Sequence, residues 1–90
     1  MPVPTPGRVV LYRLAEEDVR RITHDRAHHG LNGNFVRAGD SYPAIVVRTF
    51  PSNPAGVANL KVLLDGEDTL WVTSRHQGTE VGTWFWPERV

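Results

Sequence analysis

The sequence predicts a small, mainly β domain that carries a single helix. Two runs of strand-forming residues, 58–64 and 69–75, flank the turn sequence Asp-Gly-Glu-Asp at 65–68, which is typical of a β-hairpin. A short aromatic segment at 83–86 follows and stops at a proline. Over 15–29, the hydrophobic period changes from about two residues to about 3.6, which indicates a helix inserted between strands.

The chain begins with a proline-rich segment. Pro2, Pro4 and Pro6 lack amide donors and favour extended backbone, so residues 1–6 are predicted to form a flexible arm. Residues 7–90 are expected to form one domain, because the chain is too short for two independent cores. The first strand of this domain is predicted at 8–14.

Residues 15–29 predict an amphipathic helix. The segment has no glycine or proline, opens with three acids and ends in histidines before Gly30, which suits the helix dipole and a glycine stop. Ala15, Val19 and Ile22 form a narrow apolar seam. We therefore expect this helix to lie over a barrel edge or on a partner, not in the centre of the core.

A loop and a second strand follow the helix. Turn-forming residues fill 30–41, where Phe35 and Val36 are expected to turn back toward the core. Residues 42–50 predict a strand whose nearly continuous apolar middle suggests burial on both faces. A proline-containing turn at 51–56 should end it.

The hairpin register stays open at this point. A two-residue turn at Gly66-Glu67 would pair Asp65 with Asp68, whereas a longer loop would shift the partners. Five strands with a helix between the first two predict a small SH3-like barrel. An OB-like barrel is the alternative, and it is disfavoured because its helix usually precedes the fourth strand and 65–69 leaves no room for one.

Composition excludes several classes of function. The chain has no cysteine, which excludes disulfide frameworks, thiolate nucleophiles and cysteine-based metal sites. Ten basic and ten acidic residues cancel, so no overall charge favours nucleic acid or membrane binding. No apolar run approaches the ~20 residues of a membrane span, and the start of the chain does not resemble a signal peptide. We expect a cytoplasmic protein.

The polar clusters favour structural roles over catalysis. His24 and His28 lie one helical turn apart beside Asp25, but a catalytic zinc needs a third ligand, which only His76 or a distant carboxylate could supply. The acids at 65–68 suit a tight turn. Neither a nucleophile motif nor a phosphate-binding glycine loop is present. The sequence therefore predicts no enzyme, no metal site and no cofactor.

Tryptophans and arginines supply the candidate binding residues. Alternation along the last strand places Trp84 and Trp86 on one face and Phe85 on the other, so at least one set is not expected to be fully buried. Exposed indoles beside arginines can stack on bases or grip a peptide, at about 1–3 kcal/mol for each stacked base. In the competing interpretation, large aromatic residues fill the core of a small barrel. The candidate ligand-binding residues are Trp71, Trp84, Trp86, Arg26, Arg48 and Arg75.

Several motifs occur together along the chain: YRLAEED at 12–18, Ile22, Gly33-Asn34, Gly39-Asp40, Pro43, VVR at 46–48, VLLDGEDTLWVTS at 62–74 and GTWFWP at 82–87. Together they resemble a family of short, mostly uncharacterised proteins of actinobacteria and their phages. The chain departs from the family at 23–26, where Thr-His-Asp-Arg replaces an asparagine followed by several arginines, and at Glu67, where the family favours asparagine. The resemblance implies no settled activity.

These observations favour a non-enzymatic, phage-type binding protein. It would hold a small anionic, nucleotide-derived ligand between aromatic and arginine side chains, with a homo-oligomer as one arrangement, and would counter host defence in the host cytoplasm. The alternative is a protein-interaction or structural module, of virion or regulatory type, that binds a host or phage protein. Nucleic acid is a less favoured partner because the net charge is zero, and no membrane partner is expected.

Overall fold

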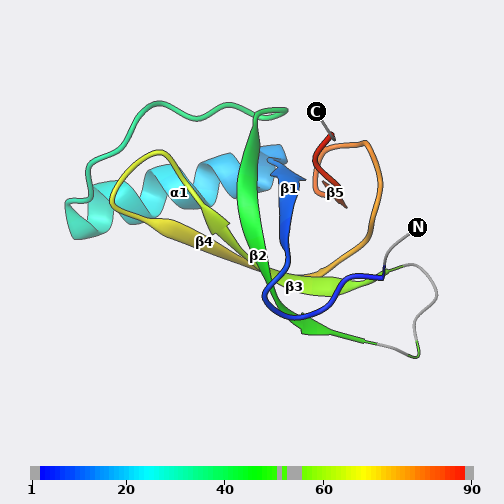
Figure 1. Cartoon of the computed structure of the whole chain (residues 1–90). Coiled ribbons are helices and arrows are strands. Elements are labelled where there is room, and N and C mark those ends of the chain that lie inside the picture. The colour runs from blue at the N-terminus through cyan, green and yellow to red at the C-terminus, as the bar shows by residue number, and fades with distance from the viewer. Residues whose placement is uncertain (1–2, 51, 53–55, 89–90) are drawn as a thin grey trace.

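A computed structural model describes residues 3–50, 52 and 56–88 of the protein, and these residues form one antiparallel sheet and one helix. In chain order the elements are β1 (Val9–Arg13), α1 (Glu16–His29), β2 (Ser41–Thr49), β3 (Ala58–Leu63), β4 (Thr69–Arg75) and β5 (Trp84–Phe85). The five strands have the order β4-β3-β2-β1-β5, and each is antiparallel to its neighbour (Figure 1). The predicted mainly β fold with one helix between the first two strands is confirmed.

α1 begins and ends where the sequence predicts. At its start, the Ala15 amide donates to Asp18 Oδ2 at 2.9 Å, so the acid satisfies a backbone group at the helix entrance. At its end, Gly30 adopts the left-handed conformation with φ of 65°, and the Leu31 amide donates to the Arg26 carbonyl. The glycine stop is therefore confirmed.

The core lies on one face of the sheet. Alternate residues of the long strands point into it, together with Ile22 from α1 and Val36 from the following loop. Its buried members are Val10, Tyr12, Leu14, Ile22, Val36, Ala44, Val46, Ala58, Leu60, Val62, Leu64, Leu70, Val72 and Trp84. The helix buries only Asp18 and Ile22, which agrees with its narrow apolar seam.

Three polar contacts hold α1 against β4, an edge strand of the sheet. Near the helix start, Arg75 Nη2 lies 3.6 Å from Asp18 Oδ1. In the middle, Arg21 Nη1 donates to the Trp71 carbonyl at 2.9 Å. Near the helix end, the Arg26 guanidinium pairs with Asp68, which comes just before β4. Because Asp18 meets the end of β4 and Arg26 meets its beginning, the helix runs antiparallel to this strand.

The second strand is buried on one face only. Ala44 and Val46 are buried, whereas Ile45 is partly exposed and Val47 is 46% exposed. The prediction that both faces would be buried is wrong, because the single helix lies on the core side of the sheet. Among the described residues, no helix or second sheet covers the other side (Figure 1).

The hairpin loop is longer than the shortest turn that its sequence allows. Leu63 pairs with Thr69 and Val62 with Leu70, so residues 64–68 connect β3 to β4. This register rules out the two-residue turn at Gly66-Glu67. The loop is longer because its central residues pair with the segment after α1, as described below.

The proline-rich arm touches the sheet where the structure describes it. Pro4 is buried, and the Gly7 amide donates to the Val46 carbonyl at 2.7 Å. Residues 1 and 2 of the predicted arm lie outside the described residues. Most of the turn predicted at 51–56 lies outside them as well.

A buried carboxylate joins α1 to β1 and β4. Asp18 is 4% exposed and accepts a hydrogen bond of 2.6 Å from the Tyr12 hydroxyl, besides its contacts with the Ala15 amide and Arg75. Burying a carboxylate is costly unless it is paired and hydrogen-bonded, so these groups depend on one another. Burial, the hydrogen bond to Asp18 and the negative charge of Asp18 raise the pKa of Tyr12 above its ordinary value.

We expect Asp18→Ala to lower the free energy of unfolding by about 3 kcal/mol, because it leaves buried donors without their acceptor. Urea unfolding followed by tryptophan fluorescence measures this loss. Glu17→Ala is the matched control, since Glu17 lies in the same helical turn but is exposed, and it should cost less than about 0.5 kcal/mol. Equal losses in the two variants would contradict a specific role for Asp18.

We also expect the fold to lose stability in alkaline solution through Tyr12. The pKa of Tyr12 is raised in the folded state, so folding favours the protonated phenol. Its contribution is complete below the unfolded pKa of about 10 and is lost as pH rises from there toward the folded pKa. Urea unfolding at several pH values above about 9 should show this decline. Tyr12→Phe should be less stable at neutral pH and should decline less steeply, and parallel curves would contradict the assignment.

Candidate functional site

The candidate tryptophans do not form one platform. Trp84 is fully buried, meets Trp86 edge-on with 5.4 Å between ring centroids, and donates from Nε1 to the Gly56 carbonyl at 3.0 Å. Trp84 is therefore a core residue, in accord with the competing interpretation. Trp86 is partly buried, and the arginine over its ring is Arg8, at 5.6 Å from the centroid. The sequence did not single out Arg8.

Arg26 is already engaged within the protein. Its Nε and Nη2 donate to the two carboxylate oxygens of Asp68 at 2.8 and 3.1 Å, and its Nη1 donates to the Asn34 carbonyl at 2.7 Å. The two charged side chains are only 13% and 7% exposed. The hydrogen bond to Asp68 raises the pKa of Arg26 further above its already high value. A bidentate and largely buried pair of this kind holds structure together and leaves little of Arg26 for a ligand.

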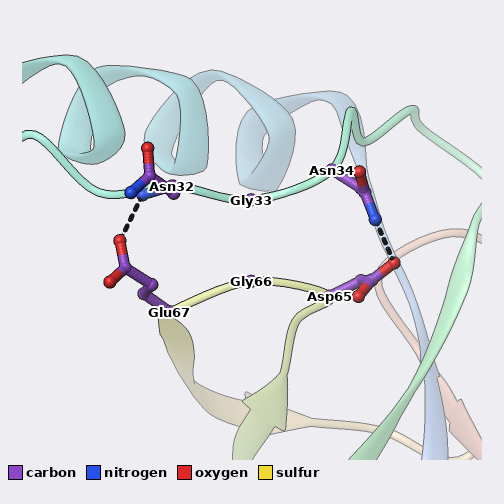
Figure 2. A pocket seen from close by; sticks show the side chains of 6 residues that line it. All are labelled: Asn32, Gly33, Asn34, Asp65, Gly66 and Glu67. Atoms are coloured by element: carbon purple, nitrogen blue, oxygen red, sulfur yellow. Dashed lines mark hydrogen bonds between the residues drawn. The ribbon is translucent and has the colours of Figure 1, made fainter.

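Two backbones meet beside this ion pair in what we call the clasp, formed by residues 32–34 and 65–67 (Figure 2). The Asn34 amide donates to the Asp65 carbonyl, and the Glu67 amide donates to the Asn32 carbonyl, both at 2.8 Å. Side chains add two bonds of 2.7 Å, from the Asn34 amide group to Asp65 and from the Asn32 backbone amide to Glu67. The acids of the hairpin loop thus bind the segment after α1, and turn geometry alone does not explain them.

Glycine is required where the two backbones of the clasp are closest. A Cβ atom on Gly66 would lie 2.6 Å from the Gly33 Cα and 2.7 Å from the Asn32 carbonyl oxygen. A Cβ atom on Gly33 would clash with the Arg26 guanidinium. Gly66 thus allows the two backbones to approach, and Gly33 leaves room for the Arg26 guanidinium beside them.

A shallow depression of about 460 Å³ lies over the clasp, lined by Asn32, Gly33, Asn34, Asp65, Gly66 and Glu67 (Figure 2). Its polar groups already bond to one another across the two backbones. The depression is thus a surface of the clasp, and its own bonds leave few free donors for a ligand.

The two histidines that are spaced like metal ligands lie elsewhere. His24 and His28 stack with 5.7 Å between ring centroids on the exposed end of α1. No group of three or more metal-ligating side chains occurs in the described ranges.

The other two candidate arginines have different surroundings. Arg75 approaches Asp18 in the buried network described above. The Arg48 guanidinium lies 5.5 Å from the Phe50 ring centroid, near the end of β2. Sequence proximity could not reveal these partners, because Asp68 and Asp18 are distant in the chain from the arginines that they bind.

Trp71 is the candidate tryptophan with the most accessible side chain. It is 48% exposed on β4 and points away from the core, whereas its neighbours Leu70 and Val72 are buried. Its backbone carbonyl accepts the bond from Arg21. Trp71 is therefore held at the backbone and free at the indole, which suits a binding residue.

Trp71 belongs to an open sheet surface that we call the outer face. One row of cross-strand partners runs from Val9 through Ile45 and Lys61 to Trp71, across β1, β2, β3 and β4. Several neighbouring outward positions are also apolar, whereas Thr69, the partner of Leu63 on β4, is polar. The outer face comprises Val9, Leu11, Pro43, Ile45, Lys61, Leu63, Trp71 and Phe85. Val9, Leu63 and Trp71 are 52%, 40% and 48% exposed. These exposed apolar side chains make the outer face the candidate binding surface of the chain.

A second hollow, of about 310 Å³, lies between α1 and the following loop, and its lining includes Val19, Thr23 and Phe35. Val36 is buried as predicted, but Phe35 is 80% exposed, so the prediction that it also turns back is wrong. Adjacent side chains in this extended segment point in opposite directions, and only Val36 reaches the core. The Arg37 guanidinium lies 5.8 Å from the Phe35 ring centroid.

No family model matches the chain, and no curated protein or solved structure matches it. The part of the chain that the structure describes contains no helix that is long and apolar enough to cross a membrane. The choice of the outer face as the candidate site is therefore based on the structure of this chain alone.

We expect Gly66→Ala to open the clasp and to cost about 1–3 kcal/mol of unfolding free energy, because its Cβ overlaps the opposite backbone. Amide hydrogen exchange should show faster exchange at Asn34 and Glu67, which donate across the clasp. Amides in the β3–β4 ladder, such as that of Val62, are the internal control and should stay protected. Unchanged exchange at Asn34 and Glu67 would contradict this account.

Proposed function

We propose that this chain is a non-enzymatic interaction module that binds another protein through its outer face. The observation that carries the proposal is the open row of Val9, Ile45, Lys61 and Trp71 across four strands. Covering apolar surface releases about 25 cal/mol for each Å² removed from water. Trp is also among the residues that dominate binding energy at protein interfaces.

The small anionic ligand expected from the sequence is the less supported proposal. Two of its three candidate arginines, Arg26 and Arg75, already face the carboxylates of Asp68 and Asp18. A phosphate-bearing ligand would have to compete with these internal partners, and Trp84 is fully buried. A role against host defence in the host cytoplasm rests on the resemblance to actinobacterial and phage proteins.

Binding, and not catalysis, suits the chemistry of the outer face. Seven of its eight members are apolar, and Lys61 is its one ionisable group. An activated nucleophile typically lies within hydrogen-bond reach of a base, and the members of the outer face include no such pair. The proposal therefore assigns no reaction to this surface.

We further propose that the sheet is an SH3-like barrel. Two observations support this proposal. The strand order β4-β3-β2-β1-β5 places β4 and β5 at opposite edges. The segment after β4 returns to β5, where the Gly78 amide donates to the Trp84 carbonyl at 2.9 Å and the Trp84 amide to the His76 carbonyl at 3.1 Å. These bonds support closure between the two edges. An OB-like barrel has less support because the helix lies between the first two strands.

We expect Trp71→Ala to weaken binding to peptides selected on this protein. Random peptides displayed on yeast are sorted against the folded chain, and Trp71→Ala should lower their affinity about thirtyfold, which corresponds to about 2 kcal/mol for an interface tryptophan. Phe35→Ala is the matched control, because Phe35 is even more exposed but lines the hollow beside α1. Thermal melting verifies that both variants fold.

Selected peptides that ignore Trp71→Ala would contradict binding at the outer face. Peptides that lose affinity with Phe35→Ala instead would assign binding to the hollow between α1 and its following loop.

A further inference from the structure

We infer that the partner of the outer face is an acidic segment, which places a carboxylate against Lys61 between large apolar side chains. This inference rests on the proposed function and deepens it. It concerns the chemistry of the partner, whereas the proposed function concerns only the surface that binds.

Lys61 lies in the interior of the outer face. It lies on β3, opposite Ile45 of β2 on one side and Trp71 of β4 on the other. It is exposed, and it is the one lysine of the chain. Within the described ranges, its ammonium group forms no ion pair, since the ion pairs found there join other residues. The outer face thus has a single charged group, which is free.

A partner that covers Trp71 and Ile45 also removes water from Lys61. Burying an ammonium group without a partner is costly, although a long lysine side chain can partly escape by extending toward solvent. A carboxylate on the partner restores the lost interaction and fixes the position of the bound segment. An acidic partner is therefore favoured over a purely apolar one.

Two arginines lie beside the outer face. Arg13 ends β1 on the outward side, with its guanidinium carbon 5.1 Å from the Phe85 ring centroid. Arg21 lies at the β4 edge, where it donates to the Trp71 carbonyl. Arg21 also lies 4.0 Å from Asp25, so part of its charge is balanced within the helix. The nearby acids Asp65 and Glu67 bond to neutral groups of Asn34 and Asn32 in the clasp and are held at the hairpin loop. On the outward side of the strands, Lys61 and Arg13 are thus the cationic groups that a carboxylate can meet.

The same lysine disfavours a second copy of the chain as the occupant. In a two-fold dimer built on this face, each residue near the axis meets its own counterpart. Lys61 lies in the middle of the row, so the two ammonium groups would approach each other as water is excluded. Like charges in such an interface cost several kcal/mol. The outer face is thus suited to a different, acidic chain.

Paired selections from the displayed random peptides test this inference. One selection uses the wild-type chain and the other uses Lys61→Glu. The wild-type selection should enrich peptides that carry Asp or Glu between large apolar residues, and Lys61→Glu should weaken those peptides tenfold or more. The Lys61→Glu selection should enrich Lys or Arg at the same peptide position. Exchanging that peptide residue from Glu to Lys should restore binding to Lys61→Glu.

Two controls separate charge from shape. Lys61→Met keeps the length of the side chain without its charge, so it should weaken acidic peptides less than Lys61→Glu does. Binding of acidic peptides should also weaken as salt concentration rises. Trp71→Ala in the wild-type background reports whether a given peptide uses the outer face at all.

The outcomes distinguish the two proposals. Peptides that depend on Trp71 but are neutral or basic, and bind Lys61→Glu equally well, would overturn the acidic partner and leave the interaction module standing. Peptides that never depend on Trp71 would overturn both. Light scattering that shows a wild-type dimer, dissociated by Trp71→Ala, would make a second copy the occupant and would also overturn the acidic partner.

Discussion

The attachment of α1 to the edge strand β4 is the contact on which the rest of the structure depends. A helix of fourteen residues that buries only Asp18 and Ile22 has little apolar area to stabilise it, and isolated helices of this length are marginal in water. Polar contacts along its length compensate: Asp18 meets Arg75, Arg21 meets the Trp71 carbonyl, and Arg26 meets Asp68. The clasp adds a second attachment just beyond the helix, so the helix and the hairpin loop are fixed as one unit.

This attachment also decides which surface is left for binding. The helix covers the core side of the sheet and bonds to the backbone of β4, whereas the outward side chains of the same strand stay accessible. Trp71 shows both effects, since its carbonyl bonds to Arg21 while its indole is 48% exposed. Because α1 bonds to the backbone of β4, this edge strand has fewer free backbone groups with which a strand of another chain could pair. The outward side chains of β4, and not its backbone edge, would then provide the specificity of binding.

The candidate site was only partly predictable. The sequence predicts Trp71 as a binding residue because exposed tryptophans favour binding, and its outward position on β4 agrees with that expectation. It predicts Trp84 on the same ground, but alternation along a short strand does not reveal which face meets the core, and Trp84 lies inside. For Arg26 and Arg75 the sequence hides the acidic partners, because Asp68 and Asp18 lie far away in the chain. Lys61 cannot be recognised from the sequence, because its place between Ile45 and Trp71 depends on pairing across three strands.

The sequence by itself determined the local elements: the helix with its acidic start and Gly30 stop, the strands, and the hairpin loop around Gly66. These follow from dihedral preferences, hydrophobic period and turn chemistry, which act over a few residues. Only the tertiary structure decided the hairpin register, the partners of the acids in the hairpin loop and the face of β2 that stays open. Those outcomes depend on contacts between residues that are distant in the chain, such as Arg26 with Asp68 and Gly33 with Gly66. No local pattern predicts that Ile45 and Trp71 lie on the same uncovered surface. A run of apolar residues in the sequence is the same whether one face or both faces of the strand are covered.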